Sequence, residues 1–565
     1  MNIDRIKGDI MEKMIKVQYK NQVVKEFPEN TMLLEIANSF QYDYDYPILV
    51  ARVNNEVEDL SHTLVKKCDI DFYDRSSVFG NNIYSKGLHF MMIVAFKKIL
   101  GNDIDIIIEN SIGRGVYCKI VGQQLTKELL HKVEEKMQEI VKADYNFVKM
   151  SVSRRDAIQF FKKKKQMDKV NVLKYISNTY VNLYRLDEYY DYFFSEMPYS
   201  TKALDEFKLS YIDEKGFVLS YPSVHNPKVT EEYVHPEMLF NAFNEYTEMG
   251  NIIGISNAAD LNEIVSTGKY NDVIQLSEAH YNSQLAKVAD MIYDKKDKVK
   301  VILLAGPTSS GKTTTARKLA IYLQARGFKT HSISIDDYFL NRVDTPKKPN
   351  GEYDFESIRA VDTDLFNKHL LKLLNGERIL LPEYNFVLGE REYKKNWLQL
   401  GKNDIVVIEG LHALNDELTM AIDKENKFKI FISTLTQLNI DNHNRIHTSD
   451  TRRLRRIIRD NKYRGYNAAD TLKSWKNILE GEEKYVFPYQ DTADVIINSA
   501  LIYELGVLKT YAEPLLFSVH EDDEVYPEAL RLINFLRNFL PIPSDDISKE
   551  SVLREFIGGS CFHEK

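Results

Sequence analysis

The sequence has few cysteines, no long apolar run and no excess of positive charge. Cys68, Cys118 and Cys561 are far apart and form no CxxC pair, so they indicate neither a disulfide framework nor a zinc site and favour a reducing, cytoplasmic location. No apolar run approaches the ~18–20 residues of a membrane-spanning helix, and the charged first residues lack the apolar segment of a signal peptide. The net charge of -8 argues against a protein that coats nucleic acid with its whole surface.

The chain has 565 residues, which predicts three or more domains because a domain typically has ~100–200 residues. Its composition, 44% hydrophobic and 28% charged, is that of an ordinary globular protein. The pattern of apolar residues and turn signals predicts five segments. They are a β-grasp module (1–78), an α+β domain (79–225), a helical connector (226–297), an α/β domain (298–513) and a C-terminal helical tail (514–565).

The stretch 299–323 has the pattern of a strand, a glycine-framed turn and a helix. Its apolar run, Val301 to Ala305, is typical of a parallel strand that is covered on both faces. The GxxxxGK[ST] pattern follows at once, and such a P-loop offers backbone N–H groups, a lysine charge and a Mg²⁺-binding hydroxyl to phosphates. We therefore expect a nucleoside triphosphate site formed by Gly306, Pro307, Thr308, Ser309, Ser310, Gly311, Lys312, Thr313 and Thr314.

Strands alternate with helices between residues 298 and 513, which predicts a doubly wound parallel sheet. Two of these strands end in acids, SISIDDYF at Asp336 and Asp337, and VVIEG at Glu409. Because ligands of such sheets lie at the carboxyl ends of the strands, these acids should face the triphosphate. Either aspartate could instead cap the next helix. We favour Asp336 as the catalytic residue, with Asp337 as the second candidate.

Seven motifs follow one another along this domain: GPTSSGKTT, SIDDYF, EYDF, LPEYNF, VVIEG, RRIIRDNKYRG and FPYQDTADVIINSA. Over about 200 residues this order resembles the uridine kinase/phosphoribulokinase family, above all its uridine kinase branch. The resemblance implies transfer of the γ-phosphate of ATP, with Mg²⁺, to the 5′-hydroxyl of a nucleoside. It implies that Asp336 receives or orients the hydroxyl proton and that Thr313 and Glu409 hold Mg²⁺. The remaining catalytic residues that it implies are Lys312, Arg459 and Arg464. Together with Arg456, these two arginines align with the lid arginines of the family, which close over the phosphates and the nucleoside.

The resemblance also implies a set of acceptor contacts. They are Asp336, Tyr353, Asp354, Tyr384, Phe386, Arg391 and Arg456. For each aromatic residue the alternative is packing in the core, and for the arginines it is a solvated or RNA-binding helix. Two positions depart from the family pattern: Gly389 stands where uridine kinases usually have a histidine, and Tyr466 where they tend to have arginine. Since hydrogen bonds to a substrate give the strongest discrimination, the sequence leaves the base open.

The N-terminal half resembles parts of tRNA synthetases. In residues 14–75, the segment PILVARVNNEVEDL predicts a strand, an Asn-Asn turn and a second strand. These residues are similar to a TGS domain, and residues 79–225 to the editing domain of threonyl- and alanyl-tRNA synthetases. Where that family has HxxxH and CxxxH metal ligands, this chain has His89, Ile93, Phe193 and Met197. One histidine cannot hold zinc, so we expect a retired editing fold kept for binding or packing, with at most a weak or vestigial RNA contact. The run 162–169 is then a solvated helix end.

Other functions stay open at this point. Among enzymes the alternative is a kinase of the same family that acts on another small hydroxyl compound, such as a sugar phosphate or a pantothenate-like molecule. Outside enzymes it is a nucleotide-gated, RNA-binding regulatory protein, although Asp336 would then have no task. Editing of aminoacyl-tRNA is a third idea, which the lost ligands oppose. The sequence does not define the oligomeric state.

Overall fold

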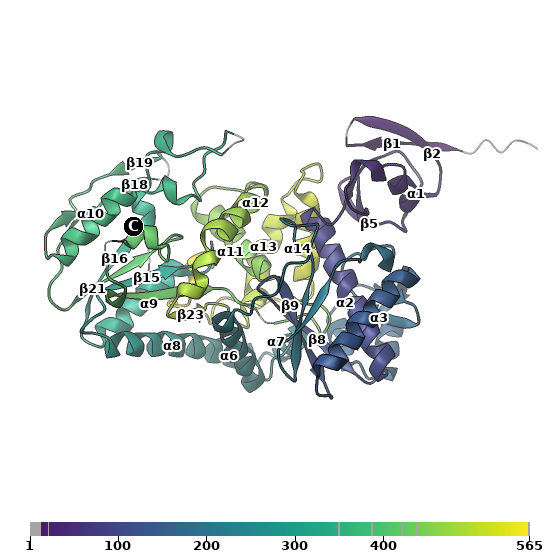
Figure 1. The fold of residues 1–565 in the computed structure, drawn as a ribbon, viewed down its shortest axis with the longest axis horizontal. Coiled ribbons are helices and arrows are strands. Elements are labelled where there is room, and N and C mark those ends of the chain that lie inside the picture. The colour runs from purple at the N-terminus through teal and green to yellow at the C-terminus, as the bar shows by residue number, and fades with distance from the viewer. Residues whose placement is uncertain are drawn as a thin grey trace, which may run out of the picture. The chain divides into compact units, whose positions relative to one another are not determined.

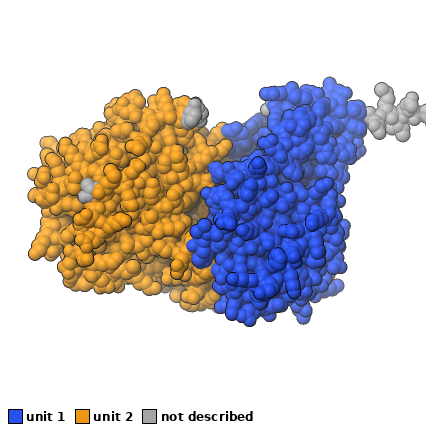
Figure 2. All heavy atoms as spheres, in the orientation of Figure 1, with its two compact units in different colours: residues 1–235, 439–445, 519–538 blue, residues 236–438, 446–518, 539–565 orange. Residues whose placement is uncertain are grey.

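The computed structural model describes residues 13–562, apart from 21, 349–350, 386–387, 421 and 437. Phe386 and the first residues of the expected β-grasp module therefore lie outside the described residues. The chain divides into two compact units (Figure 2). Unit 1 comprises residues 1–235, 439–445 and 519–538, and unit 2 comprises 236–438, 446–518 and 539–565. No helix in the described part of the chain has the length and apolar character needed to span a membrane.

Unit 1 begins with a mixed five-stranded sheet in the order β2–β1–β7–β4–β5 (Figure 1). Its elements are β1 (Met14–Tyr19), β2 (Val23–Pro28), α1 (Leu33–Asn38), β4 (Val50–Val53), β5 (Glu56–Asp59) and β7 (Cys68–Tyr73). The central strands β1 and β7 are parallel, and the other pairs are antiparallel. Asn54 and Asn55 both have positive φ angles and connect β4 to β5, which confirms the predicted Asn-Asn turn.

The next part of unit 1 contains two antiparallel sheets, β13–β14–β9–β8 and β10–β11–β12. Its elements are α2 (Val78–Leu100), β8 (Asp105–Ile112), β9 (Gly115–Val121), α3 (Lys127–Ala143), β10 (Phe147–Ser153), α4 (Arg154–Lys163), α5 (Met167–Lys174), β11 (Tyr180–Leu186), β12 (Tyr189–Tyr192), β13 (Lys208–Tyr211) and β14 (Gly216–Ser220). Residues 88–96 of α2 are buried on all sides, because an apolar helix without a polar face must lie inside the protein.

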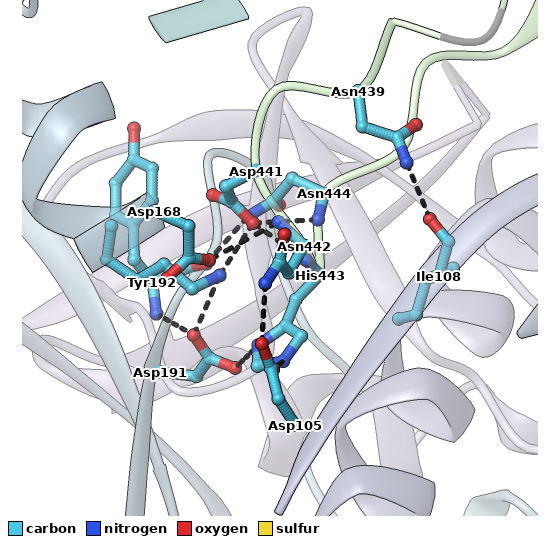
Figure 3. A network of polar contacts seen from close by, with 11 residues as sticks. Asp105, Ile108, Asp168, Asp191, Tyr192, Asn439, Asp441, Asn442, His443 and Asn444 are labelled. Carbon is cyan, nitrogen blue, oxygen red and sulfur yellow. Dashed lines mark hydrogen bonds and ion pairs between the residues drawn. The ribbon is translucent and has the colours of Figure 1, made fainter. Parts of the chain in front are cut away.

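A buried polar network joins residues 439–445 to the rest of unit 1 (Figure 3). Lys169 Nζ lies 2.6 Å from Asp441 Oδ1 and 3.1 Å from Asp191 Oδ1. Asp191 also pairs with His443, and although burial disfavours the charged ring, the Asp191 carboxylate raises the pKa of His443 to about 9. The interpretation of 162–169 as a solvated helix end is therefore wrong for Lys169, whose side chain is fully buried among carboxylates.

Backbone contacts hold the same loop on strand β8. The N–H of Ile108 donates to the carbonyl oxygen of Asn442 at 2.8 Å, and the Asn439 side-chain amide donates to the Ile108 carbonyl oxygen at 2.8 Å. Asn442 Nδ2 also donates to Asp105 at 2.7 Å (Figure 3). These bonds satisfy polar groups that burial would otherwise leave without water.

Unit 2 is built on a parallel sheet in the order β16–β21–β15–β22–β23 (Figure 1). Its strands are β15 (Val301–Ala305), β16 (Lys329–Ser334), β21 (Asp404–Glu409), β22 (Lys427–Ser433) and β23 (Val495–Asn498). All residues of β15 are buried between β21 and β22. The predicted parallel sheet is thus confirmed, and β15 lies where the chain changes from one side of the sheet to the other, the usual place for a ligand.

Helices and two short hairpins surround this sheet. They are α6 (Glu237–Ile253), α7 (Ala258–Ser266), α8 (Tyr270–Asp294), α9 (Lys312–Gln324), α10 (Thr363–Leu374), α11 (Thr448–Tyr463), α12 (Ala468–Tyr485), α13 (Glu504–Phe517), α15 (Arg554–Ile557), and the strand pairs β17 (Ile379–Leu380) with β20 (Trp397–Leu398) and β18 (Glu383–Asn385) with β19 (Glu390–Glu392). Helix α8 packs on α9, where Tyr281 Oη lies 2.5 Å from Thr315 Oγ1.

The C-terminal tail differs from the expected single segment 514–565. Helix α13 continues through the expected boundary, because Pro514 lies inside it without ending it. Residues 519–538, which include α14 (Tyr526–Leu536), belong to unit 1, whereas 539–565 return to unit 2. In unit 2 an added Cβ at Gly506 would lie 2.7 Å from Ile542 Cδ1, so the tail packs directly on the backbone of α13.

Candidate active site

The turn between β15 and α9 can be built only with glycine at two positions. A Cβ at Gly306 would lie 2.1 Å from the carbonyl oxygen of Ile432, so no side chain fits there. Gly311 has φ +85°, a left-handed conformation, and an added Cβ would lie 2.4 Å from Val552 Cγ2. The turn therefore brings its backbone close to the end of the neighbouring strand β22, just before the first turn of α9.

The polar atoms of this turn fit a phosphate. The hydroxyls of Ser309 and Ser310 are buried and have no hydrogen-bond partner within the described residues. Lys312 Nζ donates to the carbonyl oxygens of Gly306 at 2.9 Å and Pro307 at 3.1 Å, so the lysine closes on its own loop. Burial lowers the pKa of Lys312, and nearby acids oppose this effect. Phosphate oxygens would supply the acceptors that these groups lack.

Strand register brings the two predicted acids to this turn. Glu409 pairs with Leu304, just before the P-loop, and with Ser334, just before the turn that contains Asp336. Ser334 Oγ donates to Glu409 Oε1 at 3.0 Å. Burial and the neighbouring Asp336 raise the pKa of Glu409 to about 7, although Lys312 opposes the rise. The two carboxylates and the P-loop lysine therefore form one electrostatic cluster.

Asp336 and Asp337 have different surroundings. Both lie in a 3-10 turn, η3 (Ile335–Tyr338), after β16. Burial raises the pKa of Asp336, and the charges of Lys312, Arg464 and Arg459 oppose the rise. Asp337 instead accepts a hydrogen bond from the backbone N–H of Tyr384 at 3.2 Å, and burial raises its pKa to about 6. Asp336 thus lies within the influence of the P-loop lysine and of Arg459 and Arg464, while Asp337 holds strand β18.

The three predicted lid arginines surround one carboxylate, Asp460: Arg456 and Arg459 lie in helix α11, and Arg464 follows its last residue. Arg456 Nε lies 3.0 Å from Asp460 Oδ2, while Arg459 Nη2 and Arg464 Nη1 lie 3.1 and 3.5 Å from Oδ1. Arg456 Nη1 also donates to Thr308 Oγ1 in the P-loop at 2.7 Å. The charge of Arg459, together with burial, lowers the pKa of Arg464 to about 10. Repulsion among these cations favours an additional anion beside them.

Two further arginines of α11 support the P-loop, and sequence reasoning missed them. Arg455 is fully buried, bonds to Glu504 and donates to the carbonyl oxygen of Ser499 at 2.8 Å. Arg452 forms two hydrogen bonds with Glu482, whose Oε1 also accepts from the Thr308 N–H at 2.7 Å. Residue type alone cannot distinguish the arginines of RRLRRIIR that support the P-loop from those that face the site. The distinction depends on which side of the helix each arginine lies relative to the core.

The predicted acceptor residues lie on loops and hairpins of unit 2. The Tyr353 ring lies 5.7 Å from Phe355, and the ammonium of Lys347 lies 5.1 Å from its centroid. Tyr384 is only 8% exposed and its ring meets Phe339 edge-on at 5.7 Å, which is the geometry of core packing. The backbone N–H of Asp354 donates to the carbonyl oxygen of Pro346 at 2.7 Å.

Arg391 and Gly389 occupy the hairpin that follows Tyr384. Arg391 Nη1 donates to Asp362 Oδ2 at 2.9 Å, and the other oxygen of that carboxylate caps helix α10. Gly389 has φ +75°, and an added Cβ would lie 2.8 Å from Arg342 Nε. The structure thus gives a steric reason why a histidine does not stand at Gly389. It places the Arg391 guanidinium against a helix cap.

Glu356 is a further candidate that sequence reasoning missed. It follows the EYDF motif, and burial raises its pKa to about 7, with Arg456 opposing and Glu482 and Asp336 adding to the rise. Its only signal in the sequence is its position directly after Phe355, the aromatic residue that ends the motif. With this pKa, the carboxyl group of Glu356 keeps its proton in part of the molecules at neutral pH, under the influence of the charges of Arg456 and Asp336.

The four positions that the resemblance to editing domains aligned with metal ligands are all buried in unit 1. Ile93, Phe193 and Met197 belong to one apolar cluster, and the Phe90 and Phe193 rings lie 5.4 Å apart. Burial, with the charges of Arg445 and Lys86, keeps the pKa of His89 well below its usual range. Across the described part of the chain no three His, Cys, Asp or Glu side chains are grouped so that they could hold a metal ion.

Comparisons with known proteins give two kinds of relative. A uridine kinase of Halobacterium salinarum is 30% identical over 198 residues, which is 34% of this chain and 77% of that protein. A threonine–tRNA ligase of Carboxydothermus hydrogenoformans is 29% identical over 198 residues, 35% of this chain but only 31% of the ligase. A solved structure of a possible uridine kinase from Bacillus stearothermophilus, 16% identical, overlaps 38% of this chain and 100% of its own with a TM-score of 0.27.

The family model of the phosphoribulokinase / uridine kinase family matches residues 301–503. The match begins at the first residue of β15 and ends after β23, so it contains the P-loop, both acids and the lid arginines. These are the parts that the geometry above brings together. Through this part of the chain, the protein belongs to the phosphoribulokinase / uridine kinase family.

Proposed function

We propose that this protein is an ATP-dependent nucleoside kinase, similar to uridine kinases, that phosphorylates the 5′-hydroxyl of a nucleoside. The observation that carries the proposal is the position of Asp336, a partly buried carboxylate whose pKa responds to Lys312, Arg459 and Arg464. An acceptor hydroxyl beside Asp336 would therefore lie next to the cations that hold the donor phosphates. Family membership of residues 301–503 supports the phosphotransferase class.

The chain's own residues can serve each step of such a transfer. The bond between the nucleoside oxygen and the γ-phosphorus forms while the bond from that phosphorus to the bridging oxygen of ADP breaks, and the hydroxyl proton goes to Asp336. Burial raises the pKa of Asp336, which brings it nearer to the value that suits a base at neutral pH. Lys312, Arg459 and Arg464 neutralise phosphate charge, which is the main requirement of phosphoryl transfer.

Thr313 and Glu409 are the residues that we propose for Mg²⁺. Kinases commonly bind this ion through one or two carboxylates together with substrate phosphates and water, so a cage of protein ligands is not required. The raised pKa of Glu409 fits this role because a cation would favour its charged form. Bound Mg²⁺ would supply neutralising charge to the donor phosphates.

The identity of the acceptor remains part of the proposal. Tyr353 and Asp354 are proposed to contact the sugar and base, and Arg456 to contact phosphate. Gly389 favours a second candidate, a kinase of the same family for another small hydroxyl compound, because its φ of +75° and the nearby Arg342 leave no room for a base-reading histidine. Nucleosides remain the first choice because the EYDF and LPEYNF motifs are present.

We propose a TGS-like module and a retired editing domain for the N-terminal half. The similarity to a threonine–tRNA ligase over 198 residues supports this origin. Apolar side chains at Ile93, Phe193 and Met197 oppose retained metal-dependent hydrolysis. Any RNA contact by this half would therefore be a binding function.

A substrate panel with the full-length protein tests the proposal. Common ribo- and deoxyribonucleosides, a sugar phosphate and pantothenate are each incubated with ATP and Mg²⁺, and phosphorylated products are measured by chromatography. We expect a nucleoside 5′-monophosphate, abolished in Asp336→Asn and Lys312→Ala. Asp336→Asn should still bind ATP, whereas Asp337→Asn should retain transfer because its carboxylate holds Tyr384 instead. Near-normal turnover of Asp336→Asn would show that the base is assigned wrongly.

A further inference from the structure

The last part of the chain returns to the P-loop within unit 2. We call residues 551–562 the C-terminal strap. Val552 is fully buried, and its Cγ2 would lie 2.4 Å from a Cβ on Gly311. The Phe556 ring lies 4.9 Å from the Arg455 guanidinium carbon, and Lys462 Nζ donates to the carbonyl oxygen at position 557 at 2.7 Å. The strap is therefore a packed part of the kinase unit that contacts both the P-loop and the lid helix.

One side chain of the strap forms hydrogen bonds with a P-loop residue that would otherwise be available to a phosphate. Glu555 Oε2 accepts a hydrogen bond from the backbone N–H of Thr314 at 3.1 Å and from its Oγ1 at 2.7 Å. This N–H belongs to the first turn of α9, where backbone donors have no partner within the helix. Such donors are the groups that bind phosphates at a helix N-terminus. The Glu555 carboxylate thus takes a place that a donor phosphate would need.

The space beside this contact is small and strongly cationic. A cavity of about 150 Å³ lies there. Its lining residues are Thr313, Thr314, Arg317, Arg459, Tyr463, Arg464, Glu555, Ser560 and Phe562. Pockets for cofactor-sized ligands typically have ~300–1,000 Å³, so this cavity is too small for a nucleotide while the strap lines it. Three arginines face it, and Glu555 is the only carboxylate among the lining residues.

We propose that the C-terminal strap is an autoinhibitory element whose Glu555 competes with a phosphate group of the donor nucleotide for Thr314. The proposal rests on the donor site of the proposed function. Binding of the donor nucleotide requires the Glu555 side chain to leave the Thr314 N–H. The larger the fraction of molecules in which Glu555 is bound to Thr314, the lower the apparent affinity for the nucleotide. Because the carboxylate and the phosphates are both anions, their repulsion also lowers the affinity for the nucleotide.

Isothermal titration of the full-length protein with ADP and Mg²⁺ tests the competition. Glu555→Gln removes the charge but preserves the shape, and Glu555→Ala removes the contact. We expect both to bind ADP more tightly than wild type, by roughly tenfold if the bound form is dominant. Glu550→Gln is the matched control, because Glu550 is exposed and lies just before the strap. It should bind ADP with the wild-type affinity.

Each outcome separates this proposal from the proposed function. Equal ADP affinity in wild type and both Glu555 variants, with unchanged thermal unfolding, would overturn autoinhibition and leave the kinase proposal intact. Weaker binding in Glu555→Gln would show that the carboxylate supports the P-loop, which also overturns autoinhibition. Absence of ADP binding in every variant would refute the donor site itself and the strap's role together.

Discussion

The guanidinium of Arg452 and the carboxylate of Glu482 form a buried pair with two hydrogen bonds, of 2.7 and 2.9 Å. The same carboxylate accepts the N–H of Thr308 at 2.7 Å. Helix α11 supplies the arginine, α12 the glutamate and the P-loop the amide. The conformation of the P-loop is therefore held by a buried ion pair between two helices of unit 2.

Removal of Glu482 should destabilise the protein strongly. Glu482→Ala leaves Arg452 buried and unpaired, and breaking a buried ion pair in this way costs about 3–5 kcal/mol of unfolding free energy. Urea-induced unfolding measures the loss, with Glu480→Ala on the exposed side of the same helix as the control. The double variant Arg452→Met/Glu482→Leu should recover most of the stability because no charge is left unpaired. If Glu482→Ala were as stable as the control, the pair would not hold this region.

Glu409 should make the ligand-free protein less stable as the pH rises. Its pKa of about 7 in the folded state lies above the ordinary value of 4.5, so the folded state keeps this proton more readily than the unfolded state. Stability then falls between about pH 4.5 and 7 and stays lower above that range. Glu409→Gln cannot ionise and should therefore gain stability relative to wild type at pH 8, on the order of 2 kcal/mol, but little at pH 5.

Thermal unfolding at the two pH values, without nucleotide or Mg²⁺, measures this difference. Glu417→Gln is a suitable control because Glu417 is exposed. Glu409→Gln should at the same time lose phosphate transfer, the usual conflict between stability and function at an active site. A variant that is no more stable than wild type at pH 8 would contradict the raised pKa of Glu409.

Lys169 should be essential to the stability of unit 1. Lys169→Met leaves Asp191 and Asp441 without their cation in the interior, which should cost about 3–5 kcal/mol. Lys163→Met is the matched control, since Lys163 is exposed in the same basic run. Urea unfolding gives the energy, and limited proteolysis should show earlier cleavage in 439–445, the loop that Lys169 holds. Equal stability and cleavage of the two variants would show that other contacts retain the loop.

The sequence predicted the strands, P-loop and acids of unit 2 because each depends on local patterns. Val301 to Ala305 is apolar throughout, GxxxxGK[ST] follows, and Glu409 ends another apolar run. Parallel register then brings strand ends together without further information. The Asn54–Asn55 turn was predicted for the same reason, because two residues with positive φ suffice to define it.

Contacts between residues far apart in the chain could not be predicted in this way. Nothing in the pattern around Lys169 indicates a partner at Asp441, 272 residues away, or that Glu555 reaches Thr314 across 241 residues. A lysine in a basic run and a glutamate in a short tail usually face water. Their burial depends on how the whole chain packs, and the local periodicity of apolar residues contains no information about that packing.

Gly389 should tolerate neither alanine nor histidine. Its φ of +75° is strained for a residue with a side chain, at a cost of about 1–2 kcal/mol, and its Cβ would lie 2.8–2.9 Å from atoms of Arg342. Gly389→Ala should therefore lower the free energy of unfolding, whereas Gly389→His should not restore recognition of a pyrimidine. Combining Gly389→Ala with Arg342→Ala should remove the contacts with Nε and Cζ of Arg342, but it should leave the 2.9 Å approach to the Cβ of residue 342 and the backbone strain. Thermal unfolding and the ratio of kcat/KM for uridine to that for a purine nucleoside measure the two effects. A Gly389→His variant that folds normally and gains uridine selectivity would show that the hairpin can rearrange to admit the ring.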